Sequence, residues 1–384
     1  GVSTVDGTVQ AVRIAKDLTL EGGYASGSWD VSDPVARPTT VDAGGAGRVV
    51  YVASGATVTL RNLNIAHGAA EDNGGGIYNE GAVTLERSTV RDSSAVLGGG
   101  IYNAGSLAVV RSLVAGNTAG SHGAGIYSPS TATSLEVSNS TLADNIATAQ
   151  GGAIWSQAPA GTLEQSTLAD NSASTGGGLY LAAALDVKGT ILAGNTGDNC
   201  AGTAPGNDGY NLDSAATCGF GTAGGSQSNR EPSLGALEDH GGPTLTFEPR
   251  LYSPVVNAGD PEYAPPSGDT DQRGLTRVRA GRIDIGAVEV QTLCWATPNN
   301  GTTVYESEDA GAVQQAIDAT PTDGSAGHVR VAGICVRSTG NQVAYIHNRS
   351  LTLEGGYDPT NWAAGPNPAA TPTTLDAAGA ENVV

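Results

Sequence analysis

The sequence predicts an all-β protein organised as a parallel β-helix, a solenoid with one strand-rich wrap per repeat. A short phrase recurs from Thr57 to Asn195 at intervals of 24 to 28 residues, a period typical of solenoids. Apolar and polar residues alternate within each phrase, as in strands with one buried face. No amphipathic helical period of useful length separates the phrases, so the repeats are expected to stack strand on strand.

Residues 1–56, before this stretch, are expected to form the first wraps. The segment LTLEGGY, which starts at Leu18, has the pattern of a strand that ends in a glycine corner. A longer excursion follows from Ser28 and is expected to lead into another strand.

The repeats align on one small polar residue each: Ser88, Ser112, Ser140, Ser166 and Thr190. Aliphatic residues three positions before it and two after it are expected to stack inside the coil. An asparagine row five positions after it predicts an inward ladder of amide hydrogen bonds, formed by Asn117, Asn145, Asn171 and Asn195. Glycine pairs mark a corner that needs positive φ or close backbone approach, before Ile77, Ile101, Ile126, Ile154 and Leu179.

These repeats carry a family resemblance. GGGI, GAGI or GGAI, followed by a strand that ends in xxN, resembles the repeats of polymorphic outer-membrane proteins. Those repeats belong to the pectate-lyase-like class of right-handed β-helices, so the resemblance implies a right-handed, single-stranded coil. It covers residues 57–195, and residues 1–195 are interpreted as the body of the β-helix.

Residues 196–292 differ in composition, because the glycine corners stop and proline and aspartate become more frequent. GYNL, GGPT, SPVVNAGD, TDQRG and DIGAVE occur in this order from Gly209 to Glu289. The segment resembles the C-terminal module of choice-of-anchor Q proteins, a family of secreted and surface-attached bacterial β-helix proteins. The resemblance implies surface display and no known reaction.

A second repeat exists on a larger scale, because LTLEGGY recurs at Leu351, 333 residues after Leu18, with similar flanking sequence. Residues 293–384 are therefore expected to open a second β-helix unit. Residues 310–319 have a helical period, which predicts a short amphipathic helix that caps the first wrap. The corresponding helix of the first unit is expected to precede Gly1. The chain is interpreted as part of a tandem array or polymer; the alternative is one protein with two unequal β-helix domains.

Composition favours an extracellular protein. The 384 residues carry a formal net charge of −20, which argues against binding to nucleic acid or to anionic membranes. The cysteines form two local pairs, Cys200 with Cys218 and Cys294 with Cys335, without CxxC or Cys/His clusters. Disulfides in an oxidising compartment are the favoured interpretation, and four buried thiols are the alternative. The sequence shows neither a signal peptide nor a long apolar run.

Catalysis is not expected. Glycosidic hydrolysis needs two carboxylates about 5 to 10 Å apart in one groove, whereas Glu86, Glu136, Glu164 and Asp186 fall at positions predicted to face outward. A lyase would need a basic residue beside an acidic Ca²⁺ cluster. Arg87 and Arg111 share one column, but the neighbouring wraps place no acidic cluster there. The five histidines occur in unrelated contexts.

One dense polar group remains, formed by Asp260, Asp269, Asp271, Arg273, Asp284 and Glu289. The four aspartates are candidate ligands of Ca²⁺, a cation that prefers oxygen donors, and calcium is the one cofactor considered. The favoured alternative is a structural ion pair of Arg273 with Asp284 and Glu289. Asn300 fits the N-glycan acceptor pattern.

The function predicted from these observations is that of a non-enzymatic, secreted structural protein at the cell surface. The expected assembly joins copies of the unit end to end in a fibre, filament or adhesin stalk. The alternative is a secreted β-helix that binds or cleaves a polysaccharide.

Overall fold

The computed structural model describes residues 3–5, 7–250, 253–278, 282–291, 293–298, 303–307, 309–337 and 343–376. The chain divides into two compact units. The first contains Gly1–Pro249, Ala258–Arg277 and Asp284–Glu289; the second contains Arg250–Asn257, Val278–Ile283 and Val290–Val384. Most of segment 196–292 therefore shares a compact unit with the coil.

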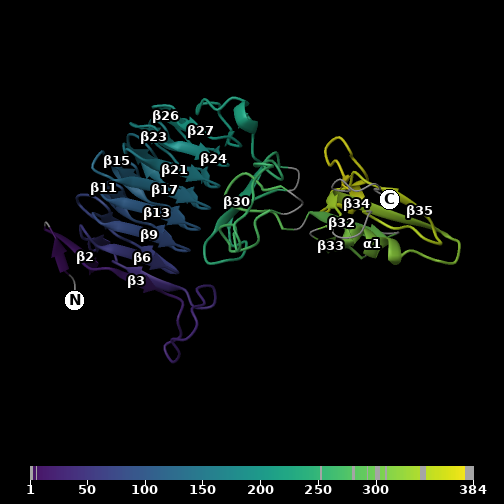
Figure 1. The fold of residues 1–384 in the computed structure, drawn as a ribbon, viewed down its shortest axis with the longest axis horizontal. Helices are drawn as coiled ribbons and strands as arrows, with labels where there is room; N and C mark the ends of the chain where they lie inside the picture. The colour runs from purple at the N-terminus through teal and green to yellow at the C-terminus, as the bar shows by residue number, and fades with distance from the viewer. Residues whose placement is uncertain are drawn as a thin grey trace. The chain divides into compact units, whose positions relative to one another are not determined.

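The first unit is a parallel β-helix, as the repeats predict (Figure 1). Its coil passes through three long sheets in turn. Sheet 1 contains β1 (Ser3–Val5), β2 (Thr8–Ile14), β5 (Arg48–Val52), β8 (Ile77–Asn79), β12 (Ile101–Asn103), β16 (Ile126–Ser128), β20 (Ile154–Ser156), β23 (Leu179–Leu181) and β26 (Cys200–Gly202). Its strands run parallel except β1, which is antiparallel to β2.

Sheet 2 contains β3 (Leu18–Glu21), β6 (Thr57–Arg61), β9 (Ala82–Glu86), β13 (Ser106–Val110), β17 (Ser134–Ser138), β21 (Gly161–Glu164), β24 (Asp186–Lys188) and β27 (Gly206–Asn207). Sheet 3 contains β4 (Thr39–Asp42), β7 (Leu63–Ala66), β10 (Thr89–Arg91), β14 (Leu113–Ala115), β18 (Thr141–Ala143), β22 (Thr167–Ala169), β25 (Ile191–Ala193), β28 (Leu212–Asp213) and β29 (Gln227–Ser228). A smaller sheet joins β11 (Ser94–Leu97), β15 (Thr118–His122) and β19 (Ile146–Ala147).

The register places each residue beside its own counterpart one wrap away. In sheet 1, Ile101 lies between Ile77 and Ile126, and in sheet 2 Val109 lies between Leu85 and Val137. These side chains are fully buried. The rows that the alignment predicts to lie inside the coil therefore form its core.

The glycine corner has both properties expected of it. Gly74 has φ +65°, and a Cβ on Gly75 would lie 2.4 Å from the carbonyl oxygen of Ser94. Two further columns adopt positive φ without glycine in most wraps, and sequence reasoning missed both. One column contains Arg87, Arg111, Asn139 and Gln165, and the other contains Asp92, Asp144 and Asp170.

Beyond the coil, the first unit continues with a short 3-10 helix, Ala223–Gly225, and an antiparallel hairpin of β30 (Leu234–Glu238) and β31 (Thr246–Pro249). Phe247 of β31 packs with Leu113, Ala115, Ala143 and Ala169 of sheet 3. The hairpin therefore covers part of the outer side of this sheet.

The second unit contains a mixed sheet and the one α-helix found among the described residues, α1 (Gly311–Asp318), where the sequence predicts it. The strands are β32 (Cys294–Pro298), β33 (Tyr305–Ser307), β34 (Ala326–Val336), β35 (Ser350–Glu354) and β36 (Thr374–Asp376). β34 is antiparallel to β32 but parallel to β35 and β36. Val313, Ala316 and Ile317 of α1 are buried with apolar residues of β32 and β34.

Candidate functional site

The asparagine row forms a continuous ladder inside the coil. The Nδ2 of Asn117 donates to Oδ1 of Asn145 at 3.0 Å, and Asn145 donates in the same way to Asn171 at 2.9 Å. Asn171 then donates to Asn195 at 3.0 Å. Each of these amides also donates to a main-chain carbonyl of another wrap, such as that of Val90 for Asn117. The ladder thus satisfies polar groups that burial would otherwise leave without partners.

The aligned serines form a second ladder of a different kind. The hydroxyl of Ser112 accepts a hydrogen bond from the main-chain N–H of Ser88 at 3.1 Å. It is itself oriented by the carbonyl of Val110, to which it donates at 2.8 Å. The same contacts recur at Ser140 and Ser166. The hydroxyl at this corner therefore links the main chains of two neighbouring wraps, since it accepts from an N–H of one wrap and donates to a carbonyl of its own wrap.

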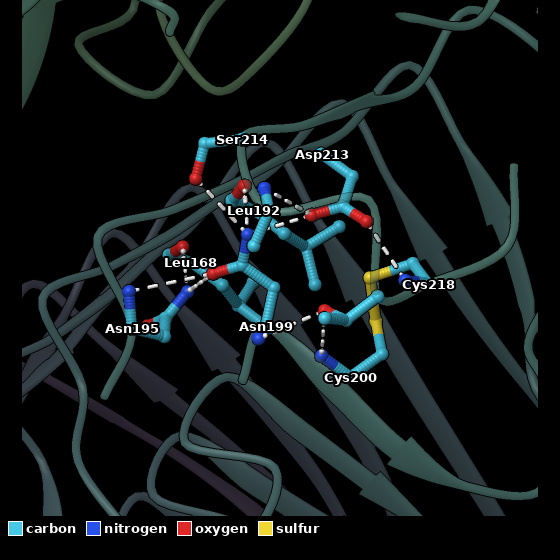
Figure 2. The surroundings of a disulfide bond; sticks show 10 residues. Leu168, Leu192, Asn195, Asn199, Cys200, Asp213, Ser214 and Cys218 are labelled. Atoms are coloured by element: carbon cyan, nitrogen blue, oxygen red, sulfur yellow. Dashed lines mark hydrogen bonds between the residues drawn. A yellow bond between two sulfur atoms is a disulfide. The ribbon is translucent and has the colours of Figure 1, made fainter. Parts of the chain in front are cut away.

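The asparagine ladder ends against the first disulfide, at residues that the period does not reveal. Figure 2 shows Asn199 at the centre of this end, and its Oδ1 accepts from Asn195 Nδ2 at 2.8 Å. Asn199 donates to the buried carboxylate of Asp213 at 2.7 Å, and Asp213 accepts from the N–H of Cys218 at 2.7 Å. The predicted Cys200–Cys218 disulfide is present beside it. Asp213 and the disulfide loop therefore close the polar end of the ladder.

The second predicted disulfide, Cys294–Cys335, joins β32 to β34 within the second unit. Both cysteines are fully buried and belong to the core that α1 covers.

A column of aromatic residues runs along the outer side of sheet 1, which the sequence analysis did not identify. It contains Tyr51, Tyr78, Tyr102, Tyr127, Trp155 and Tyr180. Neighbouring rings are stacked with centroids 4.5 to 6.3 Å apart. Burial, together with nearby Tyr102 and Glu80, raises the pKa of Tyr78 to about 12. Each inner ring is thus stacked between two neighbouring rings, and the guanidinium carbon of Arg13 lies 5.9 Å from the centroid of the end ring, Tyr51.

The predicted ion pair has different partners from those expected. Arg273 binds the carboxylate of Asp271 at 2.8 Å and that of Glu248 at 3.0 Å. It meets Glu289 through the main-chain carbonyl, whereas the Glu289 carboxylate accepts from the N–H of Asp284. Arg273 therefore does tie the TDQRG loop to the DIGAVE segment, but by a hydrogen bond to the main chain.

Three of the four calcium candidates each contact a different side chain. Asp260 pairs with Lys188 at 2.9 Å, Asp269 accepts from the Tyr263 hydroxyl at 2.5 Å, and Asp271 faces Arg273. Within the described ranges, no group of three or more His, Cys, Asp or Glu residues could hold a metal ion. The calcium cluster, which the sequence allowed as the less favoured interpretation, is thus not assembled among these residues: Lys188, Tyr263 and Arg273 contact three of the four candidate carboxylates.

Two further residues of the same segment, neither predictable from the repeats, attach it to the coil. Gln272 accepts from the Thr141 hydroxyl at 2.6 Å and donates to Thr244 at 3.0 Å. The buried Arg277 donates to Gln165 at 2.9 Å. A hydrogen bond between residues so distant in sequence has no periodic signal.

The carboxylates considered for catalysis lie along the outer side of sheet 2. Glu86 is bridged by Arg61 and Arg111, each at 2.8 Å, so Arg111 serves an ion pair. Glu136, Glu164 and Asp186 are exposed. The glycan candidate Asn300 lies outside the described residues.

The two copies of LTLEGGY build the same corner, here called the repeated corner (Leu18–Thr39 and Leu351–Thr373). The Tyr24 hydroxyl donates to Glu21 at 3.0 Å, and that of Tyr357 donates to Glu354 at 2.6 Å. Trp29 lies 5.8 Å from the Tyr24 ring, and Trp362 lies 5.6 Å from the Tyr357 ring. Thr39 accepts from the N–H of Gly23 at 2.9 Å, as Thr373 accepts from Gly356 at 2.8 Å. The duplication therefore extends from sequence to contacts.

Comparison with protein-family models, curated proteins and solved structures gives no match for this chain. No helix among the described residues is long and apolar enough to cross a membrane.

Proposed function

We propose that this protein is a non-enzymatic structural protein of the cell exterior, a β-helix unit of a tandem array or polymer. In this proposal the units join end to end and form a surface fibre, filament or adhesin stalk. The observation that carries it is the repeated corner, whose contacts in the second unit repeat those in the first. In this proposal the second corner starts a second coil, so one chain contains the beginnings of two coils in the same order.

The construction of the coil supports a mechanical role. Each wrap contacts its neighbours through main-chain hydrogen bonds and an inward apolar row, and the central wraps also through the two polar ladders. Interactions of this kind add up along one axis, so stability and stiffness grow with the number of wraps. The outward carboxylates and the net charge of −20 keep the coil soluble and oppose lateral aggregation.

The resemblance of residues 209–289 to the choice-of-anchor Q module supports display at a bacterial surface. The two disulfides support an oxidising location outside the cytoplasm. Surface display and a location outside the cytoplasm are both part of the proposal.

Electron microscopy and intact-mass measurement of native material test this function. We expect long thin fibres with a regular axial repeat, and a covalent or assembled mass well above the 38.2 kDa of this chain. Isolated short rods of that mass would overturn the array.

The second candidate is a secreted β-helix that binds or cleaves an acidic polysaccharide, and the outward aromatic column favours it. In this candidate the tyrosine hydroxyls along the column bind the hydroxyl groups of a sugar chain. Incubation with acidic polysaccharides, followed at 235 nm, tests cleavage by a lyase. The appearance of unsaturated products would replace the structural proposal with this one.

A further inference from the structure

The coil of the first unit begins with two strands that end their sheets. Among the described strands, β3 is the last member of sheet 2 and β4 is the last member of sheet 3. The inward residues Leu18, Leu20 and Val41 are only partly buried at this end, although they pack on the main core. An end of this kind exposes main-chain groups and apolar side chains that another strand can cover.

The second unit shows what covers the equivalent strands. β35 corresponds to β3, and it pairs in parallel with β34, where Leu353 lies beside Val329. β36 corresponds to β4, and it pairs with the last residues of the same strand, where Leu375 lies beside Cys335. One long strand, backed by α1, therefore closes two sheets at once.

Three side chains of the repeated corner receive β34 in the second unit. Glu354 binds His328 at 3.0 Å. The Tyr357 ring lies 5.5 Å from the guanidinium carbon of Arg330, and Thr373 donates to the carbonyl of Val331 at 3.0 Å. The Glu354 carboxylate faces the His328 imidazole and the Tyr357 ring faces the Arg330 guanidinium, so the corner suits a strand with basic residues at these two positions.

The first unit retains all three receiving groups, namely Glu21, Tyr24 and Thr39. Tyr24 already holds the Glu21 carboxylate through its hydroxyl, as Tyr357 holds Glu354. Glu21 also accepts from Asn62 at 3.3 Å, which fixes the carboxylate further. The receiving side is therefore built in advance, before any strand occupies it.

The segment that aligns with the end of β34 is β1, and it pairs differently. Gly1 aligns with Gly333, so Ser3 corresponds to Cys335. Cys335 lies beside β36 in a parallel pair, whereas Ser3 lies beside Gln10 in an antiparallel pair with β2. The two aligned segments thus pair differently: the end of β34 pairs in parallel with β36, whereas β1 pairs antiparallel with β2.

We propose that β3 and β4 form a docking edge for a second copy of the cap element, residues 293–332, which pairs with them as β34 pairs with β35 and β36. In this arrangement the copied Val329 lies beside Leu20, and His328 and Arg330 reach Glu21 and Tyr24. β1 leaves β2 and continues the docked strand along β4. This inference rests on the proposed end-to-end order and defines the register in which the start of each coil is closed.

A disulfide trap in an extended chain tests the register. The full chain is extended so that a copy of residues 293–332 directly precedes Gly1, with Cys294→Ser in the copy because Ser3 stands where its partner would be. His328→Cys in the copy is combined with Thr19→Cys, since His328 lies beside Thr352, the counterpart of Thr19. Neighbouring strands are about 4.8 Å apart, within the range that a disulfide bridges. We expect this disulfide in the majority of chains by peptide mapping.

The matched control moves the second cysteine one wrap further, to Thr59→Cys, because Thr59 lies beside Thr19 on β6. The docked copy would then be about 10 Å away, too far for a disulfide. Equal cross-linking at both positions, or none at Thr19, would overturn the proposed register.

A second measurement does not depend on added cysteines. The extended chain should melt at a higher temperature than the original chain, and Glu21→Gln should reduce this gain more than Glu136→Gln, an exposed carboxylate in the middle of sheet 2. No gain in melting temperature would contradict docking. If the cross-link at Thr19 formed but the native protein were a short single rod, the array would be refuted and the docking edge supported. If the native protein formed fibres but this cross-link did not form, the array would be supported and the docking edge refuted.

Discussion

The central wraps, residues 77–195, and the opening of the second unit, residues 293–376, stabilise their strands in different ways. In the central wraps a buried residue has its own counterparts as neighbours, as Ile101 lies between Ile77 and Ile126. In the second unit β34 has unlike neighbours: antiparallel β32, parallel β35 and the helix α1. Stability is therefore distributed along rows in the first region and concentrated in a few contacts in the second.

The largest expected effect comes from removing the disulfide of the second unit, Cys294–Cys335. Replacing Cys294 and Cys335 together by serine should reduce the free energy of unfolding of the second unit by about 4 kcal/mol, because the disulfide closes a loop with a sequence separation of 41. Calorimetry should show the loss in the transition of this unit, while that of the coil stays in place.

The matched change is the pair Cys200→Ser and Cys218→Ser, whose sequence separation is 18. It should cost about 3 kcal/mol and affect the coil instead. If either double variant lowered both transitions equally, the two units would not unfold independently and the comparison would fail.

The same contrast explains what the sequence could predict. Asn117, Asn145 and Asn171 were predictable as a ladder because a wrap repeats its own chemistry, and one aligned column fixes the partner of every member. Asn199 and Asp213 continue the ladder outside the period, so no column contains them. The positive φ of Arg87 was also hidden, since a corner that most often lacks glycine has no sequence signal.

The polar cluster around Arg273 shows a second limit. Its composition allowed both a calcium site and an ion pair, because carboxylates serve either purpose. The choice depends on Lys188 and Glu248, which are remote in sequence and reach Asp260 and Arg273 only after folding. The attachment of Gln272 to Thr141 depends equally on how the segment lies on sheet 3.

The next prediction tests how much one member of the asparagine ladder contributes to the stability of the coil. Asn145→Ala removes an amide that accepts from the side chain of Asn117 and donates to Asn171 and to the Val114 carbonyl. Several buried polar groups would lose partners, so the coil should lose about 3 kcal/mol in urea unfolding.

The control is Asn64→Ala, on the partly exposed side of β7 in sheet 3, which should change the unfolding free energy by less than about 0.5 kcal/mol. A cost at Asn145 as small as this would mean that the ladder relaxes around a gap, and the rows would then be more tolerant than we infer.

A smaller effect is expected on the outer side of sheet 1. Trp155 stacks on Tyr127 at 4.5 Å and faces Tyr180 at 6.3 Å. Trp155→Leu should lower the unfolding free energy of the coil by about 1 kcal/mol, the scale of a stacked aromatic pair. Trp29→Leu serves as the comparison, since Trp29 is 73% exposed and lies outside the column. If both variants lost the same unfolding free energy, stacking in the aromatic column would not contribute to the stability of the coil.

The smallest effect concerns charge repeated along a row. Burial, and then the charge of Glu231, raises the pKa of Asp170, while burial and then Asp170 raise that of Asp144. A raised carboxyl pKa means that the folded state favours the protonated form, so this stabilisation is present below the unfolded value, near 3.8, and is lost as the pH rises through the folded value.

Asp170→Asn should therefore raise the melting temperature at pH 7 by about 1 °C, corresponding to a few tenths of a kcal/mol at a partly solvated site. Asparagine tolerates the positive φ of this position, so no backbone cost offsets the gain. At pH 3 both carboxyls are protonated in the folded and unfolded states, and the difference should vanish. Glu136→Gln should leave the melting temperature unchanged at both pH values. If the gain in melting temperature persisted at pH 3, it would have to come from the shape of the asparagine side chain. The repeated carboxylates would then not destabilise the coil by mutual repulsion.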